Sequence, residues 1–297
     1  MTEPELHPCL NCGIPLQGVY CHRCGQKDQN RRLPLKALLH DVMHDLWHVD
    51  HKLLESLWLL LRRPGFLAEE YLAGRRVRHV PPFRLYVIAS FALFMAFSFV
   101  KVGNTRGGSA TVQVHAVEGP TPHAPAASEP AVPEEAGAGK KTKKSQKPAW
   151  AEHLKVRAKE VQKDPERFYR AFLSNLSKSL FVLMPLFAGL LMLLHLRRNQ
   201  SFFVDHMVVA LHHHVVCFLA ILLLMGLAAL PGEDWGCLPG GIIFLAPPLH
   251  LGATLQRLYR RGWLRSLTKA LLISTVYGFI VTAALVGLLL WSLPKAT

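Results

Sequence analysis

The sequence predicts an all-α integral membrane protein with about five transmembrane helices and a small N-terminal zinc ribbon. Half of the 297 residues are hydrophobic although 18% are charged, and the two kinds of residue occupy separate stretches. A bilayer requires this separation, because a charge at its centre costs roughly 2.5–3.5 kcal/mol on insertion scales. Four of the six cysteines also lie within the first 24 residues, in two closely spaced pairs.

The two cysteine pairs predict a metal-binding module over residues 1–30. Each pair has two residues between its cysteines and is followed by glycine, which allows the left-handed turn of a metal knuckle. The four expected ligands are Cys9, Cys12, Cys21 and Cys24. Four thiolates around Zn²⁺ leave no open coordination position, so we expect a structural zinc site. A redox dithiol is the alternative, but it needs only one pair and usually a thioredoxin-type context.

The rest of the chain divides by composition. Residues 34–80 indicate amphipathic or interfacial helices in the cytoplasm, and 83–102 a first transmembrane helix. Residues 103–148, rich in Pro, Ala and Lys, indicate a disordered tether. From 150 to 297 we expect a charged helix and then transmembrane helices at about 180–196, 206–230, 240–256 and 269–292. The run 240–256 is the weakest, because it contains Pro247, Pro248 and His250.

Basic residues favour one orientation of these helices. They flank the expected membrane segments on one side, in the order Arg75, Arg76, Arg78, Arg84, Arg197, Arg198, Arg257, Arg260, Arg261, Arg265 and Lys269. The positive-inside rule then places the N-terminus in the cytoplasm and, with five crossings, the C-terminus in the periplasm of a bacterial inner membrane. No signal peptide is visible at the polar start of the sequence, which agrees with a cytosolic N-terminus.

Histidines supply the other candidate site. His40, His44, His48 and His51 recur on one face of the helix expected before the membrane region. They indicate either metal ligands or the polar border of an interfacial helix. A second set, His206, His212, His213, His214 and His250, falls inside expected membrane helices near their cytoplasmic ends. Ionisable groups there mark a functional site by default, here a second metal or a proton-handling site. The alternative is neutral histidines that join neighbouring helices.

The order of several motifs resembles a known family. The motifs are the cysteine ribbon Cys-Leu-Asn-Cys-Gly…Cys-His-Arg-Cys-Gly-Gln, then Arg-Arg-Pro-Gly-Phe, Glu-Glu-Tyr-Leu-Ala-Gly-Arg-Arg, Pro-Pro-Phe-Arg-Leu-Tyr, Leu-Met-Pro-Leu-Phe-Ala and Asp-His-Met-Val-Val-Ala-Leu-His. Together they are similar to a family of bacterial inner-membrane proteins that carry an N-terminal zinc ribbon. The resemblance covers nearly the whole chain except the tether. It implies a helical membrane fold and a ribbon, and it implies no particular activity.

Three functional hypotheses follow. We favour a non-enzymatic assembly, envelope or transport-related factor that uses the ribbon to contact a cytoplasmic protein. The alternatives are a metal-dependent membrane enzyme acting on lipid through the histidines, and a metal-ion or proton transporter. The formal net charge of +14 argues for anionic lipid headgroups rather than nucleic acid, because the basic residues lie beside apolar segments. Arg75, Arg76, Arg78 and Arg84 are therefore expected to anchor the topology or to contact lipid phosphates.

Overall fold

A computed structural model describes residues 7–28, 51–99, 157, 161–195, 203–229 and 238–293. His40, His44, His48 and the expected tether at 103–148 lie outside these residues. The described part is helical, with two isolated β-bridges near the cysteines and no strand. Its helices are α2 (His51–Arg62), α3 (Phe66–Leu72), α4 (Pro82–Phe99), α6 (Pro165–Leu194), α7 (Phe203–Ala228), α8 (Leu238–Tyr259) and α9 (Trp263–Ser292). The expected all-α fold is confirmed over this part of the chain.

The short helices α2 and α3 precede the membrane region. In α2 the buried residues Leu53, Ser56 and Leu60 recur every three or four positions, the spacing of one helical face. Proline at position 64 cannot extend α2, and Gly65 follows with φ 77, a left-handed conformation that favours glycine. This turn starts α3 immediately, so the two helices are connected without a long loop.

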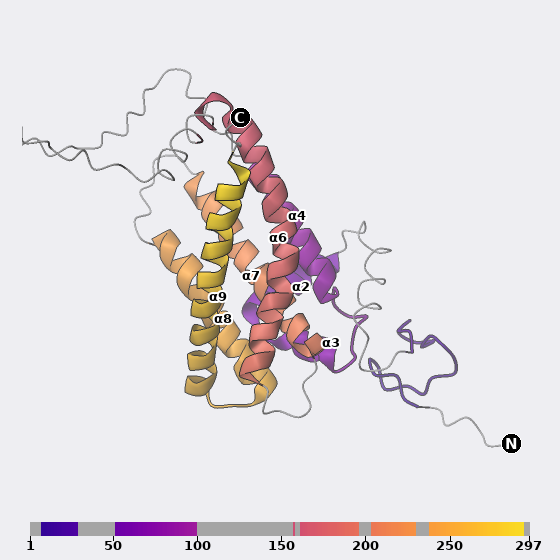
Figure 1. Ribbon diagram of the computed structural model, residues 1–297. Coiled ribbons are helices and arrows are strands. Elements are labelled where there is room, and N and C mark those ends of the chain that lie inside the picture. The colour runs from indigo at the N-terminus through magenta and orange to yellow at the C-terminus, as the bar shows by residue number, and fades with distance from the viewer. Residues whose placement is uncertain are drawn as a thin grey trace, which may run out of the picture. The chain divides into compact units, whose positions relative to one another are not determined.

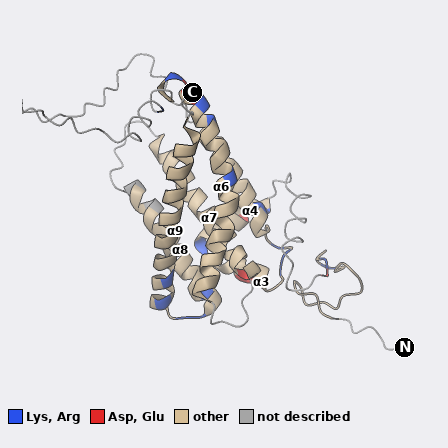
Figure 2. Ribbon diagram, in the orientation of Figure 1, with Lys and Arg blue, Asp and Glu red and all other residues tan. Residues whose placement is uncertain are grey.

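Four described helices are long and apolar enough to cross a membrane: α4, α6, α7 and α9. In Figure 2 they carry few Lys or Arg along their middle parts, whereas basic residues mark the turn between α8 and α9. The four helices indicate a membrane protein, as the sequence predicts.

The expected number of five spans is wrong, because only four of the described helices are long and apolar enough to cross a membrane. The run 240–256 does form a helix, but α8 is not one of the four candidates. Pro247, Pro248 and the polar His250 interrupt its apolar sequence. The periplasmic C-terminus, which depended on five crossings, loses its basis with this correction.

The helix α7 forms the centre of the bundle. It packs against α4 and α8, and α8 packs in turn against α9 (Figure 1). An uninterrupted buried stretch of α7 runs from His206 to Val216. By contrast, large side chains such as Phe279 and Trp291 on α9 are exposed, as expected for helices that face lipid. The bundle therefore encloses the histidine-rich helix and leaves apolar side chains of α9 exposed on its outside.

Contacts along two helix pairs show their relative directions. Asn175 in the first half of α6 donates a hydrogen bond to Ser292 at the end of α9 (3.2 Å), and Lys269 near the start of α9 donates to the carbonyl of Leu194 at the end of α6 (3.4 Å), so these helices are antiparallel. Tyr259 at the end of α8 contacts His206 at the start of α7 (3.0 Å), which makes this pair antiparallel as well. Together these contacts place the α8–α9 turn at the end of the bundle where α7 begins. All of them lie within one compact unit, Met1–Val100 with Glu166–Leu293.

Candidate functional site

The two cysteine pairs form two knuckles with the same backbone geometry. In the first, Cys9 N–H donates to the Ile14 carbonyl and Gly13 N–H donates to the Cys9 carbonyl, both at 2.8 Å. In the second, Cys21 and Gly25 repeat these bonds at the same distances. Both glycines have positive φ, 78 and 70, as the sequence predicts for these turns.

The knuckles bring the four sulfur atoms together. Cys9 Sγ lies 3.6 Å from Cys24 Sγ, Cys12 Sγ lies 3.4 Å from Cys21 Sγ, and all four lie within 4.8 Å of one another. A regular tetrahedron of sulfurs 2.3 Å from Zn²⁺ has edges of about 3.8 Å. The cluster could therefore hold a metal ion such as zinc, and its soft sulfur donors suit zinc better than Mg²⁺ or Ca²⁺.

The apolar core of this cysteine module is very small. Its buried apolar residues are Cys9, Leu16 and Cys21, with the other two cysteines packed against them. A core this small cannot offset the conformational entropy of folding, so a bound metal would supply the missing free energy. The site is thus suited to a structural ion.

The described histidines differ sharply in burial. His51 is exposed at the start of α2. His206, His212, His213 and His214 are all buried in α7, and His250 in α8 is partly buried. The sequence predicts their position inside the bundle, but the structure adds what each ring contacts.

Most of these rings bond to backbone or hydroxyl groups. His212 Nδ1 lies 2.9 Å from the Val208 carbonyl, and His214 Nδ1 lies 2.8 Å from the Ala210 carbonyl. Because a carbonyl only accepts, both Nδ1 atoms carry the proton and both Nε2 atoms offer a lone pair. His214 Nε2 accordingly accepts from the Tyr277 hydroxyl of α9 at 2.8 Å. His213 stacks on Phe187 of α6, with ring centres 4.7 Å apart.

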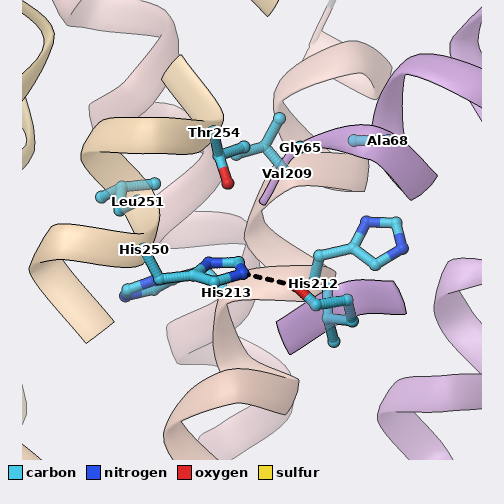
Figure 3. A pocket seen from close by; sticks show the side chains of 9 residues that line it. Gly65, Ala68, Val209, His212, His213, His250, Leu251 and Thr254 are labelled. Carbon is cyan, nitrogen blue, oxygen red and sulfur yellow. Dashed lines mark hydrogen bonds between the residues drawn. The ribbon is translucent and has the colours of Figure 1, made fainter. Parts of the chain in front are cut away.

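His250 connects two distant parts of the chain. Its Nε2 donates to the carbonyl of Leu60 in α2 at 2.7 Å, across 190 positions of sequence. Figure 3 shows this bond and a cavity around it, between α7, α8 and the α2–α3 segment. The lining includes Gly65, Val209, His212, His213 and Thr254.

The cavity is small, and its mostly apolar lining includes three histidines and Thr254. Its volume of about 10 Å³ is close to what one water molecule needs. In the described part of the chain, His212 Nε2, His213 Nδ1 and Thr254 Oγ1 are buried without a hydrogen-bond partner. The predicted second metal site stays a prediction, because His40, His44 and His48 lie outside the described residues. Among the described residues, only the four cysteines bring three or more potential ligand atoms close enough to share an ion.

The basic residues before α4 have different environments. Arg75 donates two hydrogen bonds to Glu70, at 2.7 and 2.5 Å, and this guanidinium lowers the pKa of the Glu70 carboxyl. Arg76 lies over the Tyr71 ring at 4.9 Å, whereas the Arg78 side chain is exposed. Arg84 lies in the first turn of α4 and is partly buried. Arg75 therefore has a structural partner that the sequence analysis did not foresee.

Several residues of these sites were missed from sequence. Gln26 bonds the loop between α3 and α4, and Leu60, Gly65 and Thr254 line the cavity. Tyr277 bonds His214, and Glu69 of α3 pairs with Arg257 of α8. Their partners are far away along the chain, so no local pattern marks them. Gln26 alone had a usable signal, because it directly follows the second knuckle.

One comparison with known proteins found a match, over a short part of the chain. Residues 50–94 match the model of a family described as a protein of unknown function (DUF3667). The match covers α2, α3 and most of α4, and it ends before α6. No curated protein and no solved structure matches the chain.

Proposed function

We propose that this chain is a non-enzymatic integral membrane factor whose cysteine module holds a structural zinc ion and acts as an interaction module. The sulfur geometry carries this proposal. Four thiol sulfurs within 4.8 Å of one another can fill every position around a tetrahedral zinc ion. A zinc ion held in this way has no position left for water or substrate, so it stabilises a fold instead of catalysing a reaction. An assembly, envelope or transport-related role is consistent with such a factor.

The module also has a surface suited to a partner. Val19 and Tyr20, in the segment between the two knuckles, expose 62% and 61% of their area. Adjacent exposed apolar residues on so small a metal module favour contact with another protein. We propose a cytoplasmic protein as this partner.

We further propose the inner membrane of a bacterium as the location, with the module and the α8–α9 turn on the cytoplasmic side. The turn contains Arg260 and Arg261, with Arg257 at the end of α8 and Arg265 at the start of α9, and Arg75, Arg76 and Arg78 precede α4. Both groups of basic residues would lie on one side, as the positive-inside rule requires, and would face anionic headgroups.

Metal analysis of the purified full-length protein tests the central claim. We expect about one zinc ion per chain. Replacing Cys9 and Cys12 together by Ser should abolish zinc binding, because two thiolates cannot complete the tetrahedron. The matched control is His213→Ala, which alters the cavity and should leave the zinc content unchanged.

Two results would overturn the proposal. One is zinc at wild-type content in the double cysteine variant. The other is a second metal, or iron, that survives loss of the cysteines and disappears in His213→Ala. The second result would instead favour an enzyme or a metal transporter that uses the histidines.

A further inference from the structure

Gln26 connects the cysteine module to the loop between α3 and α4. Its backbone belongs to the second knuckle, because its carbonyl accepts from Cys21 N–H at 2.8 Å. Its side chain reaches the loop in the other direction: Nε2 donates to the Gly74 carbonyl at 2.9 Å, and Oε1 accepts from Arg76 N–H at 3.1 Å. One residue therefore belongs to both structures.

This contact is buried and specific. Gln26 is 8% exposed, so both ends of its amide would be costly to leave without partners. A carboxamide can donate to one backbone position through its nitrogen and accept from another through its oxygen at the same time. A hydrocarbon or a carboxylate at this position could not satisfy both.

The first knuckle contacts the same loop through Leu10. A Cβ atom added at Gly74 would lie 2.7 Å from Leu10 Cδ1, which is too close for two carbon atoms. Gly74 also has φ 87, where other residues are strained. Its lack of a side chain thus lets Leu10 pack directly on the loop, and both knuckles take part in the contact.

The loop that receives the module is itself fixed to the helices. Arg75 is paired with Glu70 of α3, and Val80 N–H donates to Ser56 Oγ of α2 at 3.1 Å. Glu69 of α3 accepts from Arg257 of α8 at 2.7 Å. A change in how the module binds residues 73–76 would therefore act on a segment connected to α2, α3 and α8.

We infer that the metal-loaded cysteine module is an intramolecular clamp on the α3–α4 loop, and that loss of the metal releases this loop. The inference rests on the proposed zinc site, because the metal is what holds the Cys21–Gln26 turn in shape. It identifies the chain itself as one binding partner of the module. The loop then responds to whether zinc is bound.

Hydrogen exchange on the full-length protein in detergent tests this clamp, with zinc content measured in parallel. Gln26→Ala should keep its zinc, yet the Arg76 amide should exchange about tenfold faster, because it loses its buried hydrogen bond to Gln26 Oε1. Removing zinc from the wild type with a chelator, or replacing Cys9 and Cys12 by Ser, should give the same increase. The matched control is Gln17→Ala, since Gln17 is exposed on the same module.

The outcomes separate the clamp from the proposed zinc site. Unchanged exchange in Gln26→Ala overturns the clamp even if zinc is present. Unchanged exchange after zinc removal overturns the role of the metal. A wild-type protein without zinc overturns both the proposed function and the metal-dependent release, whereas Gln26→Ala still decides whether the docking contact exists.

Discussion

Single residues at the α2–α3 junction carry constraints that composition does not reveal. Gly65 shows this most clearly, because it combines φ 77 with close packing. A Cβ atom there would lie 3.1 Å from Thr254 Cα and 3.2 Å from the Thr254 carbonyl oxygen. Both neighbours are backbone atoms and cannot rotate away. The requirement for a residue without a side chain at this position comes from α8, nearly 190 positions later in the chain.

Gly65→Ala should destabilise the protein by roughly 1–3 kcal/mol, because it adds backbone strain and a steric conflict with α8. Thermal unfolding in detergent measures the effect. Gly278→Ala is the matched control: position 278 lies inside α9 with open space around it, so alanine should be neutral or slightly stabilising. Equal melting temperatures for both variants would mean that the junction adapts easily.

The buried residue His79 predicts that the stability of the protein depends on pH. Its ring is buried, and in the described part of the chain neither ring nitrogen has a hydrogen-bond partner. Burial and the nearby Arg78 lower the pKa of His79, while Glu55 and Glu70 act in the opposite direction. The folded state therefore favours the neutral ring. This contribution to stability is complete above the unfolded pKa of about 6.5 and is lost as pH falls towards the lower folded value.

The prediction compares the wild type with His79→Phe, which keeps an aromatic ring beside Phe66 but cannot be protonated. Between pH 7.5 and 5.5 the melting temperature of the wild type should fall more than that of the variant. The other histidines titrate equally in both proteins, so they cancel in the comparison. An equal fall in melting temperature for both proteins would show that His79 is not the acid-sensitive group.

At the scale of elements, polar contacts join the apolar helices of the bundle. The Tyr277 hydroxyl of α9 lies 2.8 Å from His214 Nε2 of α7 and 3.3 Å from the Leu183 carbonyl of α6. His195, directly after α6, stacks on Tyr259 of α8, with ring centres 4.2 Å apart. These contacts agree with the hypothesis that the buried histidines join neighbouring helices. The partners of the histidines are tyrosines and carbonyls, and the tyrosines lie far away in sequence. The spacing of the histidines alone therefore could not decide between a metal site and contacts that join helices.

Tyr277→Phe should lower stability by about 1 kcal/mol, because it removes one hydroxyl and leaves His214 Nε2 without a donor inside the bundle. Tyr20→Phe, at an exposed position of the cysteine module, should have no measurable effect. Chemical or thermal unfolding of the two variants in the same detergent provides the comparison. A stable Tyr277→Phe protein would indicate that His214 finds another donor.

For the whole molecule, the basic residues predict an orientation that labelling can test. Arg261 lies exposed in the α8–α9 turn. A cysteine placed there should react with a membrane-impermeant maleimide in inverted vesicles and stay protected in intact cells, because the turn is predicted to be cytoplasmic. The same substitution in detergent-solubilised protein confirms that the thiol is reactive. Labelling in intact cells would reverse the proposed orientation.

The parts of this molecule that were predictable from sequence are those set by local spacing. The cysteine knuckles need only four ligands and two glycines within 17 positions. The close approach of the four sulfur atoms could therefore be inferred directly from the sequence. Long apolar runs likewise indicated α4, α6, α7 and α9. The cavity and the clamp could not be inferred, because they depend on pairs such as His250 with Leu60 and Gln26 with Gly74 that only the packed bundle brings together.

The helix α3 gives these separate features a mechanical connection. Its seven residues extend about 10 Å, and a helix of two turns is too short to bend along its length. Gly65, just before it, and Ala68, within it, line the histidine cavity, while the loop after it receives Gln26. Because a helix this short moves as one body, a displacement of the whole of α3 would shift both the loop that receives Gln26 and, about 10 Å away, the wall of the cavity.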